Sequence, residues 1–343
     1  MTTIARAAPI APAAEAHGRL RRMIFGYVVS QVVGAFARLR LADELASGAR
    51  TVAELAGTSG ADSDALNRLL RAAAGIGLVD SDDGLHFTLT AVGAGLRSEG
   101  RSLRDLAVTF TGPAYWRPIE QLADAVMSGG PRAEQSLGSS VWDYFRGHPE
   151  EGASFDAAMS NLSVIDALDV VTHYDVSGFR RIVDVGGGRG HLLAGLLDSN
   201  PAATGVLFDQ PDAAAGGREV LDGRGLTGRV EATGGDFFTD VPSGGDLYVL
   251  KAILHDWDDE HSLRILRNCH RAAAPGSTLL VIERVVGAGA DPSVHLVDLL
   301  MLTMLGGRER SRAEFEALLG AAGFRLERIT PTPRFGLIEA RRV

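Results

Sequence analysis

After Gly178 the chain alternates between short apolar runs and longer amphipathic stretches. Such alternation predicts buried strands separated by helices, which is the signature of an α/β fold with a doubly wound parallel sheet. Two final runs, Phe324–Ile329 and Phe335–Ala340, predict an antiparallel pair. The runs expected to form parallel strands are Arg181–Val185, Thr204–Phe208, Arg229–Ala232, Leu247–Leu250 and Thr278–Ile282.

The amino-terminal part of the chain is mostly helical in pattern. Residues 1–15 read as a disordered tail, and apolar residues at three- and four-residue spacing predict a helix over Ala16–Ala46. Between Met23 and Phe36 the polar face of this helix is thin. A helix that is apolar on most sides needs cover on most sides, so we expect a homodimer joined through this region.

A winged helix-turn-helix is expected between Thr51 and Leu96. Thr51 can cap a first short helix, and Asp62 or Ser63 opens a second. The turn residues Ser81–Gly84 then predict a hairpin. Two helices followed by a small wing make up this motif.

Charge narrows the classes of function. The chain has 343 residues, with 34 basic and 43 acidic side chains and a formal net charge of -9. An acidic chain argues against a protein that binds the nucleic-acid backbone. On the second helix of the winged motif Asp62 and Asp64 cancel Arg68 and Arg71. These charges favour a dimerisation or scaffold role and leave a ligand-responsive DNA-binding regulator as an alternative function.

Cysteine content and apolar run length indicate the compartment. Cys269 is the only cysteine, which excludes a disulfide framework within one chain and fits a reducing environment. The longest apolar runs are too short for a membrane span or for the core of a signal peptide. We therefore expect a cytoplasmic protein with no membrane partner.

The sequence Val183–Gly190 reads VDVGGGRG and follows the first expected strand. Glycines here let the backbone pass close to a ligand and adopt positive φ, at the strand end where such sheets bind ligands. A dinucleotide fingerprint would need a third glycine at position 191, which is His191. The spacing G-x-G-x-G instead fits S-adenosylmethionine (SAM), and a tight turn without a ligand is the alternative.

The next strand ends also carry side chains suited to a ligand. Asp209 ends the second strand and can accept both hydroxyls of a ribose. Asp236 and Phe237 follow the third strand and suit an adenine amine and its flat face. Lys251, after the fourth strand, is the only lysine in the chain. A lysine kept among so many arginines indicates a place where a wide guanidinium cannot replace a compact ammonium.

His255 lies just past the fourth strand, on the ligand side. Glu283 at the end of the fifth strand and Glu309 after Gly306–Arg308 are candidates to orient it. The acids that follow His255, up to Glu260, could be read as a metal site. They fall at the start of a helix, however, where carboxylates satisfy free amides, so we expect no metal.

From about Ala16 to its end, the chain resembles the SAM-dependent O-methyltransferases of the plant caffeate and bacterial antibiotic-tailoring type. The matching sequences, in the family's order and spacing, are VDVGGGRG, LFDQP, GGDFF, LKAILHDWDDE, LLVIERV and GGRERS. The resemblance implies a Rossmann-like SAM-binding domain behind a winged-helix dimerisation domain. We assign residues 1–15 to a tail, 16–100 to the dimerisation domain, 101–177 to a helical linker and acceptor-pocket region, and 178–343 to the methyltransferase domain.

Carried over by position, the resemblance implies a role for each candidate residue. His255 would be the general base, with Glu283 and Glu309 flanking its ring. The SAM pocket would be lined by Gly186, Gly188, Asp209, Gly235, Asp236, Phe237 and Lys251. The acceptor pocket would be lined by Phe155, Met159, Asn161, Asp256, Asp298, Met301 and Leu305. For Met159 and Met301, core packing is an equal alternative.

The expected reaction is methyl transfer from the SAM sulfonium to a hydroxyl of a small aromatic acceptor. A phenol with a pKa of about 10 is a weak nucleophile at neutral pH, so a histidine that removes its proton would speed the transfer. A relative that kept SAM but performs hydroxylation or decarboxylation is a second alternative. Loss of the histidine would favour that alternative, and His255 is present.

Overall fold

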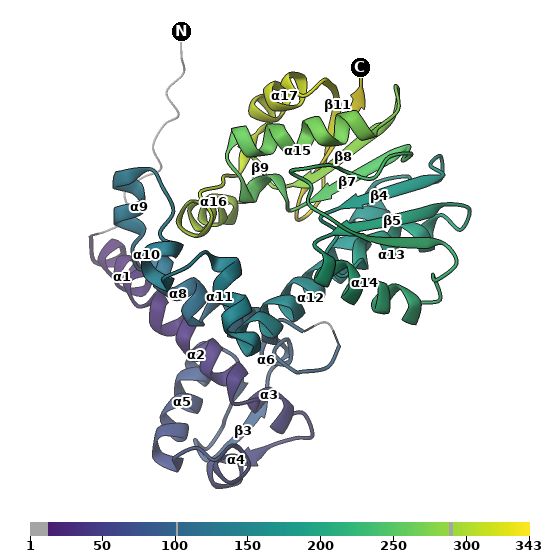
Figure 1. Ribbon diagram of the computed structural model, residues 1–343. Coiled ribbons are helices and arrows are strands. Elements are labelled where there is room, and N and C mark those ends of the chain that lie inside the picture. The colour runs from purple at the N-terminus through teal and green to yellow at the C-terminus, as the bar shows by residue number, and fades with distance from the viewer. Residues whose placement is uncertain (1–12, 101, 288–290) are drawn as a thin grey trace. The chain divides into compact units, whose positions relative to one another are not determined.

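The computed structural model describes residues 13–100, 102–287 and 291–343. The chain divides into two compact units, Met1–Gly112 and Pro113–Val343 (Figure 1). The expected tail, residues 1–15, lies almost wholly outside the described residues. Within the described ranges, no helix has the length and apolar character needed to cross a membrane.

The first unit is mostly helical. The predicted helix over Ala16–Ala46 is broken into three, because the chain turns at Phe25 and again at Arg40, whose φ of 55° is left-handed. The elements of this unit are α1 (Ala13–Ile24), α2 (Gly26–Arg38), α3 (Leu41–Glu44), β1 (Arg50–Thr51), α4 (Val52–Ser59), α5 (Ser63–Gly75), β2 (Val79–Asp80), β3 (His86–Leu89), α6 (Ala91–Ala94) and α7 (Arg104–Phe110).

The predicted winged helix is confirmed. Thr51 caps α4 in a capping box with Glu54, and Asp62 caps α5 through the Ala65 N–H. Strands β2 and β3 form the hairpin, and β1 pairs with β3 to complete a three-stranded sheet in the order β1-β3-β2. Phe36 and Phe87 are buried in the core that these elements enclose.

Helices α1 and α2 carry an exposed apolar surface. Its large side chains are all more than a third exposed in the single chain, in contrast to the buried Phe36 near the end of α2. An apolar surface of this extent marks an interaction site. We name this set the α1–α2 apolar surface, and it consists of Leu20, Met23, Ile24, Phe25, Tyr27, Val28 and Val29.

The second unit begins with helices and continues as the α/β fold. The helices are interrupted at Gly129, which ends α9 in a left-handed conformation. The first helices are α8 (Pro113–Ile119), α9 (Leu122–Ser128), α10 (Ala133–Leu137), α11 (Val141–Gly147) and the long α12 (Pro149–His173).

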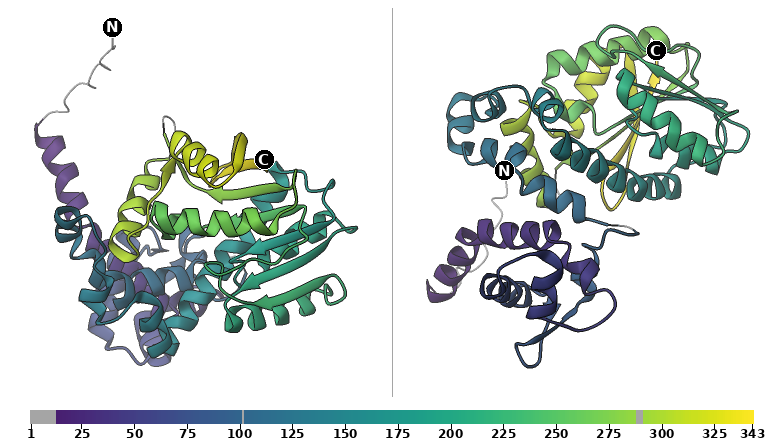
Figure 2. Two further views of the ribbon diagram at one scale, coloured as in Figure 1. Left: turned by 45° about the horizontal axis from the view of Figure 1, so that its top comes forward. Right: turned by 60° about the horizontal axis from the view of Figure 1, so that its bottom comes forward.

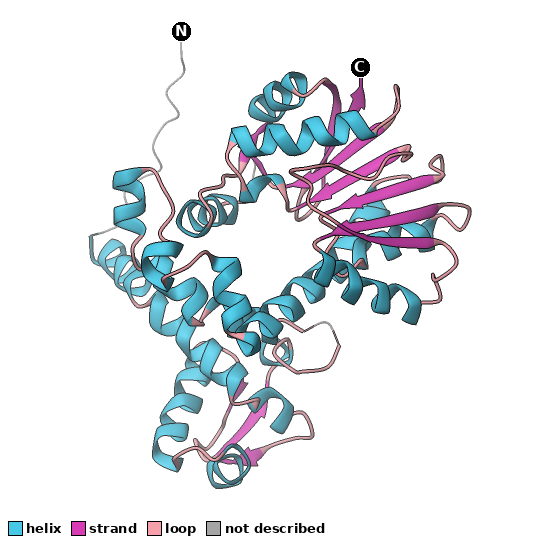
Figure 3. Ribbon diagram, in the orientation of Figure 1, coloured by secondary structure: helices cyan, strands magenta, loops and turns pink. Residues whose placement is uncertain are grey.

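The sheet of the second unit has seven strands in the order β11-β12-β8-β7-β4-β5-β6, drawn in magenta in Figure 3. Strands β4 to β8 pair in parallel, and β12 and β11 close one side as the predicted antiparallel pair. The strands are β4 (Arg181–Val185), β5 (Thr204–Asp209), β6 (Val230–Gly234), β7 (Leu247–Lys251), β8 (Thr278–Glu283), β11 (Phe324–Pro331) and β12 (Gly336–Arg342).

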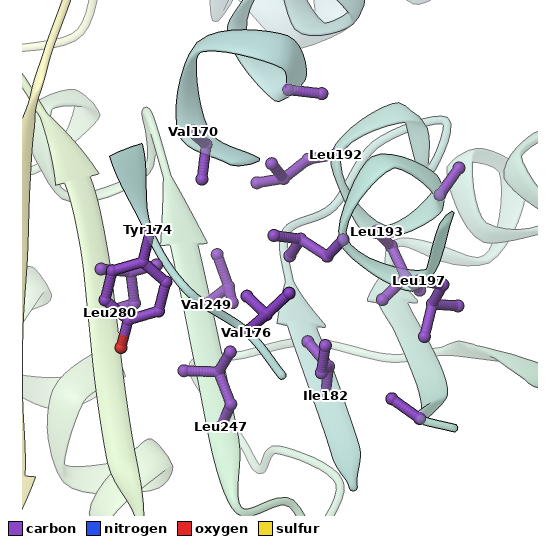
Figure 4. Packing of buried hydrophobic residues seen from close by; sticks show 14 of the residues in the cluster. Val170, Tyr174, Val176, Ile182, Leu192, Leu193, Leu197, Leu247, Val249 and Leu280 are labelled. Carbon is purple, nitrogen blue, oxygen red and sulfur yellow. The ribbon is translucent and has the colours of Figure 1, made fainter. Parts of the chain in front are cut away.

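Helices cover both faces of this sheet (Figures 1 and 2). One core packs α12, α13 (His191–Ser199) and α14 (Pro211–Gly223) against side chains such as Ile182 and Val249, and Figure 4 shows part of it around Leu193 of α13. The other core packs α15 (Asp259–Ala272) and α17 (Arg312–Ala321) against the alternate side chains, such as Val183 and Leu250. The remaining elements are the 3₁₀ turn η1 (Leu254–Asp256), β9 (Val285–Val286), α16 (Ser293–Met304) and β10 (Arg310–Ser311).

Candidate active site

The glycine-rich turn after β4 adopts backbone conformations that favour glycine. Gly186, Gly188 and Gly190 have φ values of 70°, 56° and 74°, in the left-handed region that side chains disfavour. A Cβ on Gly186 would lie 2.4 Å from the Ile253 side chain, whereas a Cβ on Gly188 would meet nothing within 4 Å. The turn therefore packs tightly at Gly186 and presents open backbone at Gly188, at the edge where doubly wound sheets bind ligands.

Asp209 joins this turn to the end of β5. Its Oδ2 accepts the Gly188 N–H at 2.8 Å, and its Oδ1 accepts the Gln210 N–H at 2.6 Å. Burial raises the pKa of the Asp209 carboxyl group. Each carboxylate oxygen has a second lone pair, so Asp209 can accept ligand hydroxyls while it holds the turn.

The segment after β6 presents a carboxylate and an aromatic ring. A Cβ on Gly235 would lie 2.4 Å from the Phe208 ring, so a larger residue does not fit there. Asp236 is exposed, and its Oδ1 accepts the Phe238 N–H at 2.8 Å. The half-buried Phe237 ring meets Trp257 edge to face, with centroids 6.3 Å apart.

Lys251 ends β7, and its ammonium is paired within the second unit. Nζ donates to Asp166 Oδ2 at 3.1 Å, and Asp166, on α12, is 2% exposed. Arg334, between β11 and β12, places Nε 2.8 Å from the other Asp166 oxygen. The ammonium also lies 5.9 Å from the centroid of the Phe335 ring.

These groups fit SAM, which combines an aromatic base, a ribose and a charged methionyl end. Asp209 and Asp236 offer acceptors for hydroxyl and amine groups, and Phe237 offers an aromatic surface. The strand order is β7-β4-β5-β6. Lys251, at the end of β7, therefore offers a cation on the opposite side of the glycine turn from Asp209 and Asp236. The open backbone at Gly188 leaves room for a ligand between them.

The turn η1, which carries His255, is held by a buried carboxylate. The residue before Ile253, Ala252, has a φ of 51°, which is uncommon for a residue with a side chain. Glu283, at the end of β8, is 1% exposed. Its Oε1 accepts three consecutive backbone N–H groups, those of Ile253, Leu254 and His255, at 2.9, 2.9 and 3.4 Å. The carboxylate replaces hydrogen bonds that so short a turn cannot make itself.

The His255 ring lies among three carboxylates. Nδ1 lies 2.9 Å from Glu309 Oε1 and 3.8 Å from Glu283 Oε2, and Nε2 lies 3.4 Å from Asp256 Oδ1. Burial alone would lower the pKa of His255, but the neighbouring carboxylates outweigh it and raise the pKa to about 9. With the Nδ1 proton donated to Glu309, Nε2 is the nitrogen that can take up or release a proton.

Arg310 holds the same turn from the other side. Its side chain is 1% exposed and donates to the Leu254 carbonyl at 2.8 Å and the Trp257 carbonyl at 2.9 Å. It also donates to Ser262 Oγ at 3.2 Å and pairs with Asp259 at 2.8 Å. One planar guanidinium thereby fixes both ends of the turn.

A short parallel strand pair brings Glu309 and Arg310 to this place. Strand β10 pairs with β9, with Arg310 opposite Val285, and this pair was not expected from the sequence. Just before it, a Cβ on Gly307 would lie 2.0 Å from the His255 carbonyl oxygen, so glycine lets the segment lie directly against the turn. The Arg308 N–H donates to that same oxygen at 2.9 Å.

Two of the candidate acceptor residues belong to one apolar cluster. The Phe155 ring is stacked on Phe145 with centroids 4.7 Å apart, and it meets Trp142 edge to face at 5.8 Å. Leu305 packs against the same cluster, together with the buried Met304. This cluster offers flat apolar surface in the same unit as His255.

The remaining candidates are polar groups near His255 or side chains on α12 and α16. Asp298 Oδ1 accepts the Glu309 N–H at 2.8 Å, so Asp298 supports the partner of the histidine. Burial raises the pKa of Asp256 to about 6, and burial with the nearby Asp256 raises the pKa of the Tyr115 hydroxyl. Met159 and Asn161 are half-buried on α12, and Met301 is 7% exposed on α16.

The histidine and its carboxylates also have a spacing that a metal ion could use. Ligand atoms of His255, Glu283 and Glu309 all lie within 4.8 Å of one another. One oxygen of each glutamate is already engaged, by backbone N–H groups or by the ring. The Oε2 atoms of both glutamates have no hydrogen-bond partner among the described residues. The same three side chains could therefore either transfer a proton or hold a metal ion.

Three residues of the site were missed from the sequence. Arg310 follows Glu309 directly, but nothing in the chain shows that an arginine is buried. Asp166 had a detectable signal, because it lies four residues before the buried Val170 on one helix face, where a charge needs a partner. Arg334 lies in a turn remote in sequence from both Asp166 and Lys251.

The arrangement defines a SAM-dependent methyltransferase: a doubly wound sheet, a glycine turn after its central strand, and acceptors after the next two strands. The chain belongs to the O-methyltransferase family. A family model of the O-methyltransferase domain matches residues 119–325, and a model of the O-methyltransferase dimerisation domain matches residues 21–97. The predicted fold class and family are confirmed.

Similar proteins have both oxygen and nitrogen acceptors. The chain is 39% identical over 325 residues to a phenazine O-methyltransferase of Lysobacter antibioticus, covering 94% of this chain and 95% of that one. It is 38% identical to an 8-amino-8-demethylriboflavin N,N-dimethyltransferase of Streptomyces davaonensis, covering 88% of each. An O-methyltransferase of neocarzinostatin biosynthesis, solved with SAM and 2-hydroxy-5-methyl naphthoic acid, has a TM-score of 0.81 at 36% identity over 92% of this chain and 96% of that one. SAM is accordingly the cofactor of this family and of this chain.

Replacing Arg310 by methionine should destabilise the fold around η1. A hydrogen bond that involves a charged group contributes about 1.5–3 kcal/mol, and Arg310 donates two such bonds to backbone carbonyls of the turn. Urea unfolding should show the loss as a lower midpoint. The exposed neighbour Arg312 is the matched control, and Arg312→Met should stay within about 0.5 kcal/mol of the wild type. Equal midpoints for the two variants would contradict the role given to Arg310.

Proposed function

We propose that the protein transfers the methyl group of SAM to a hydroxyl of a small aromatic acceptor of secondary metabolism, with His255 as the general base. The observation that carries this proposal is the buried ring of His255, 2.9 Å from Glu309 Oε1, on a turn fixed by Glu283 and Arg310. A histidine so fixed can remove a proton as the oxygen attacks. The relative named as a phenazine O-methyltransferase supports this acceptor class.

The cofactor would be held by residues at the carboxyl edge of the sheet. SAM supplies a methyl group on a positively charged sulfur, which is the electrophile of the reaction. Asp209 would accept the ribose hydroxyls, Asp236 the adenine amine, and Lys251 would hold the charged methionyl end. The residues that complete this pocket are Gly186, Gly188, Gly235 and Phe237.

His255 would move the proton at Nε2. When the acceptor hydroxyl loses its proton to the ring, the carboxylates of Glu309 and Glu283 stabilise the imidazolium that forms. The same carboxylates raise the pKa of His255 to about 9, so at pH 7 only about one ring in a hundred is neutral. Activity with a weakly acidic phenol should therefore increase as the pH rises toward 9.

The acceptor would lie against the aromatic cluster. The stacked rings of Phe155 and Phe145 match a flat apolar molecule, and Asp256 beside His255 Nε2 is placed to bind a second polar group of it. The residues proposed to line this pocket are Phe155, Met159, Asn161, Asp256, Asp298, Met301 and Leu305.

Nitrogen methylation is the second candidate activity, because one relative is an N,N-dimethyltransferase. An aromatic amine attacks with its own lone pair and needs no proton removed first, so His255 would matter little for it. A panel of hydroxyl and amine acceptors incubated with SAM, read by mass spectrometry for added methyl groups, separates the two. Methylation of amines alone would replace the oxygen proposal.

Asp209→Ala should weaken SAM binding by roughly 2–3 kcal/mol, the range for hydrogen bonds to a charged group. Calorimetry measures this change directly. The sheet should keep its fold, because Asp209 lies at a strand end and its side-chain bonds reach only the Gly188 and Gln210 N–H groups. Asp212→Ala, an exposed acid in the first turn of α14, is the control. Wild-type affinity in Asp209→Ala would remove this residue from the cofactor site.

His255→Ala should lower single-turnover methylation of a phenol of pKa about 10 by roughly 10²–10⁴-fold. SAM affinity should barely change, because the proposed cofactor contacts lie elsewhere. An acceptor that is already ionised at neutral pH should react equally well with both proteins, because it needs no base. A variant within about threefold of the wild type on the weakly acidic phenol would end the assignment.

The pH profile adds an independent test of His255. The ring is protonated below its raised pKa, so wild-type activity should fall as the pH drops below about 9 and level off above it. His255→Gln has no such group, and its residual rate should keep rising until the phenol itself ionises near a pKa of about 10. Prolonged dialysis against a chelator should leave activity unchanged. Loss of activity restored by a divalent metal would assign the histidine cluster to metal binding instead.

The protein should be a homodimer through the α1–α2 apolar surface. Light scattering at micromolar concentration should give twice the chain mass. Replacing Phe25 and Tyr27 together by serine should shift the protein toward monomer, because each is more than half exposed in the single chain. Val92→Ser, an equally exposed apolar residue outside this surface, is the control. A monomeric wild type would refute the proposal.

A further inference from the structure

Three cations surround one buried phenylalanine at the carboxyl end of β7 and β8. The Phe335 ring is 6% exposed, and its centroid lies 5.2 Å from the Arg284 guanidinium, 5.9 Å from Lys251 Nζ and 6.0 Å from the Arg334 guanidinium. Arg284 also faces Glu309, at 3.9 Å. A ring face attracts cations but does not neutralise them.

Asp166 is the carboxylate that two of these cations share. One oxygen accepts from Lys251 Nζ at 3.1 Å, and the other lies 2.8 Å from Arg334 Nε. The Asp166 side chain is 2% exposed and that of Lys251 only 14%. Desolvating such a pair costs about as much as its attraction returns, and an apolar pair would often be as stable. Stability alone therefore does not account for it.

The charge of the cluster fits one end of SAM. Lys251, Arg334 and Asp166 together carry one net positive charge, and Arg284 divides its charge between this cluster and Glu309. The proposed adenine and ribose acceptors stand after β6 and β5, so the methionyl end falls toward β4 and β7, where Lys251 stands. That end carries an α-ammonium and a carboxylate, and the carboxylate is the one group of it that a cation attracts.

We propose that Asp166 is a positioning residue that holds the Lys251 ammonium at the end of β7 to receive the methionyl carboxylate, and that Arg334 fixes Asp166 in turn. The inference rests on the proposed function, in which Lys251 contacts SAM. The inference adds Asp166 on α12 and Arg334 in the turn between β11 and β12. Both residues act through Lys251 and do not touch the cofactor themselves.

The direction in which one substitution changes the affinity for a carboxylate ligand separates a positioning role from a simple effect of charge. Asp166→Asn keeps the shape of the side chain and removes its negative charge. If Asp166 acted only as a nearby charge, its removal would strengthen the binding of a carboxylate ligand, because like charges repel. If it positions Lys251, its removal frees the long lysine side chain and weakens that binding.

The test is calorimetry with two probes on the full chain. S-adenosylhomocysteine keeps the carboxylate, and 5′-methylthioadenosine lacks the whole amino-acid end. Asp166→Asn should weaken the first by about tenfold or more and change the second by less than about twofold. Arg334→Gln should show the same pattern. Unchanged or tighter binding of S-adenosylhomocysteine, or equal loss of both probes, would overturn the proposal.

Two further variants distinguish a failure of the Asp166 positioning role from a failure of the proposed function. Lys251→Gln should lose affinity for S-adenosylhomocysteine and keep that for 5′-methylthioadenosine. If Lys251→Gln binds both like the wild type, Lys251 leaves the proposed cofactor site. If it loses affinity and Asp166→Asn does not, the positioning role alone is rejected. Arg325→Gln, an exposed arginine on β11, should bind both probes like the wild type.

Discussion

The site depends on the Glu283 carboxylate, which accepts hydrogen bonds from three consecutive backbone N–H groups. The turn that carries His255 is too short to satisfy its own amides, and it follows a left-handed alanine, so it needs an outside acceptor. Burial raises the pKa of Glu283, while the nearby His255 opposes that shift. Glu283 thus fixes the path of the backbone and adds to the negative charge that Glu309 and Asp256 place around the ring.

Two clusters of opposite sign lie close together at the edge of the sheet. Carboxylates surround His255, and cations surround Phe335, and Arg284 belongs to both because it approaches Glu309 and the phenylalanine ring. A ligand with a positive sulfur and a negative carboxylate would be oriented by such a field before any contact forms. Under the proposed function, the orientation in which SAM binds therefore depends on this arrangement of charges as well as on the shape set by the glycine turns.

The sequence predicted what depends on local pattern. The five parallel strands follow from apolar runs such as Arg181–Val185, and the helix starts at Thr51 and Asp62 follow from capping chemistry. The sequence did not predict the break at Arg40, because hydrophobic periodicity does not report a left-handed residue within a helical pattern. The β9–β10 pair is only two residues long and joins distant segments, so no run of residues announces it. Arg310, Asp166 and Arg334 gain their roles from burial and long-range pairing, which depend on the finished fold.

The presence of one lysine in the whole chain has a practical consequence for chemistry on this protein. Apart from the α-amino group, Lys251 Nζ is the single aliphatic amine, and it stands in an ion pair with little exposure. The one thiol, Cys269, is fully buried. Reagents that modify amines or thiols therefore have almost nothing to react with on the surface. Isotope-labelled methyl groups added by reductive methylation would keep the positive charge and could sit only on Lys251 and the α-amino group, so one side-chain signal would follow events at the end of β7 without any engineered label.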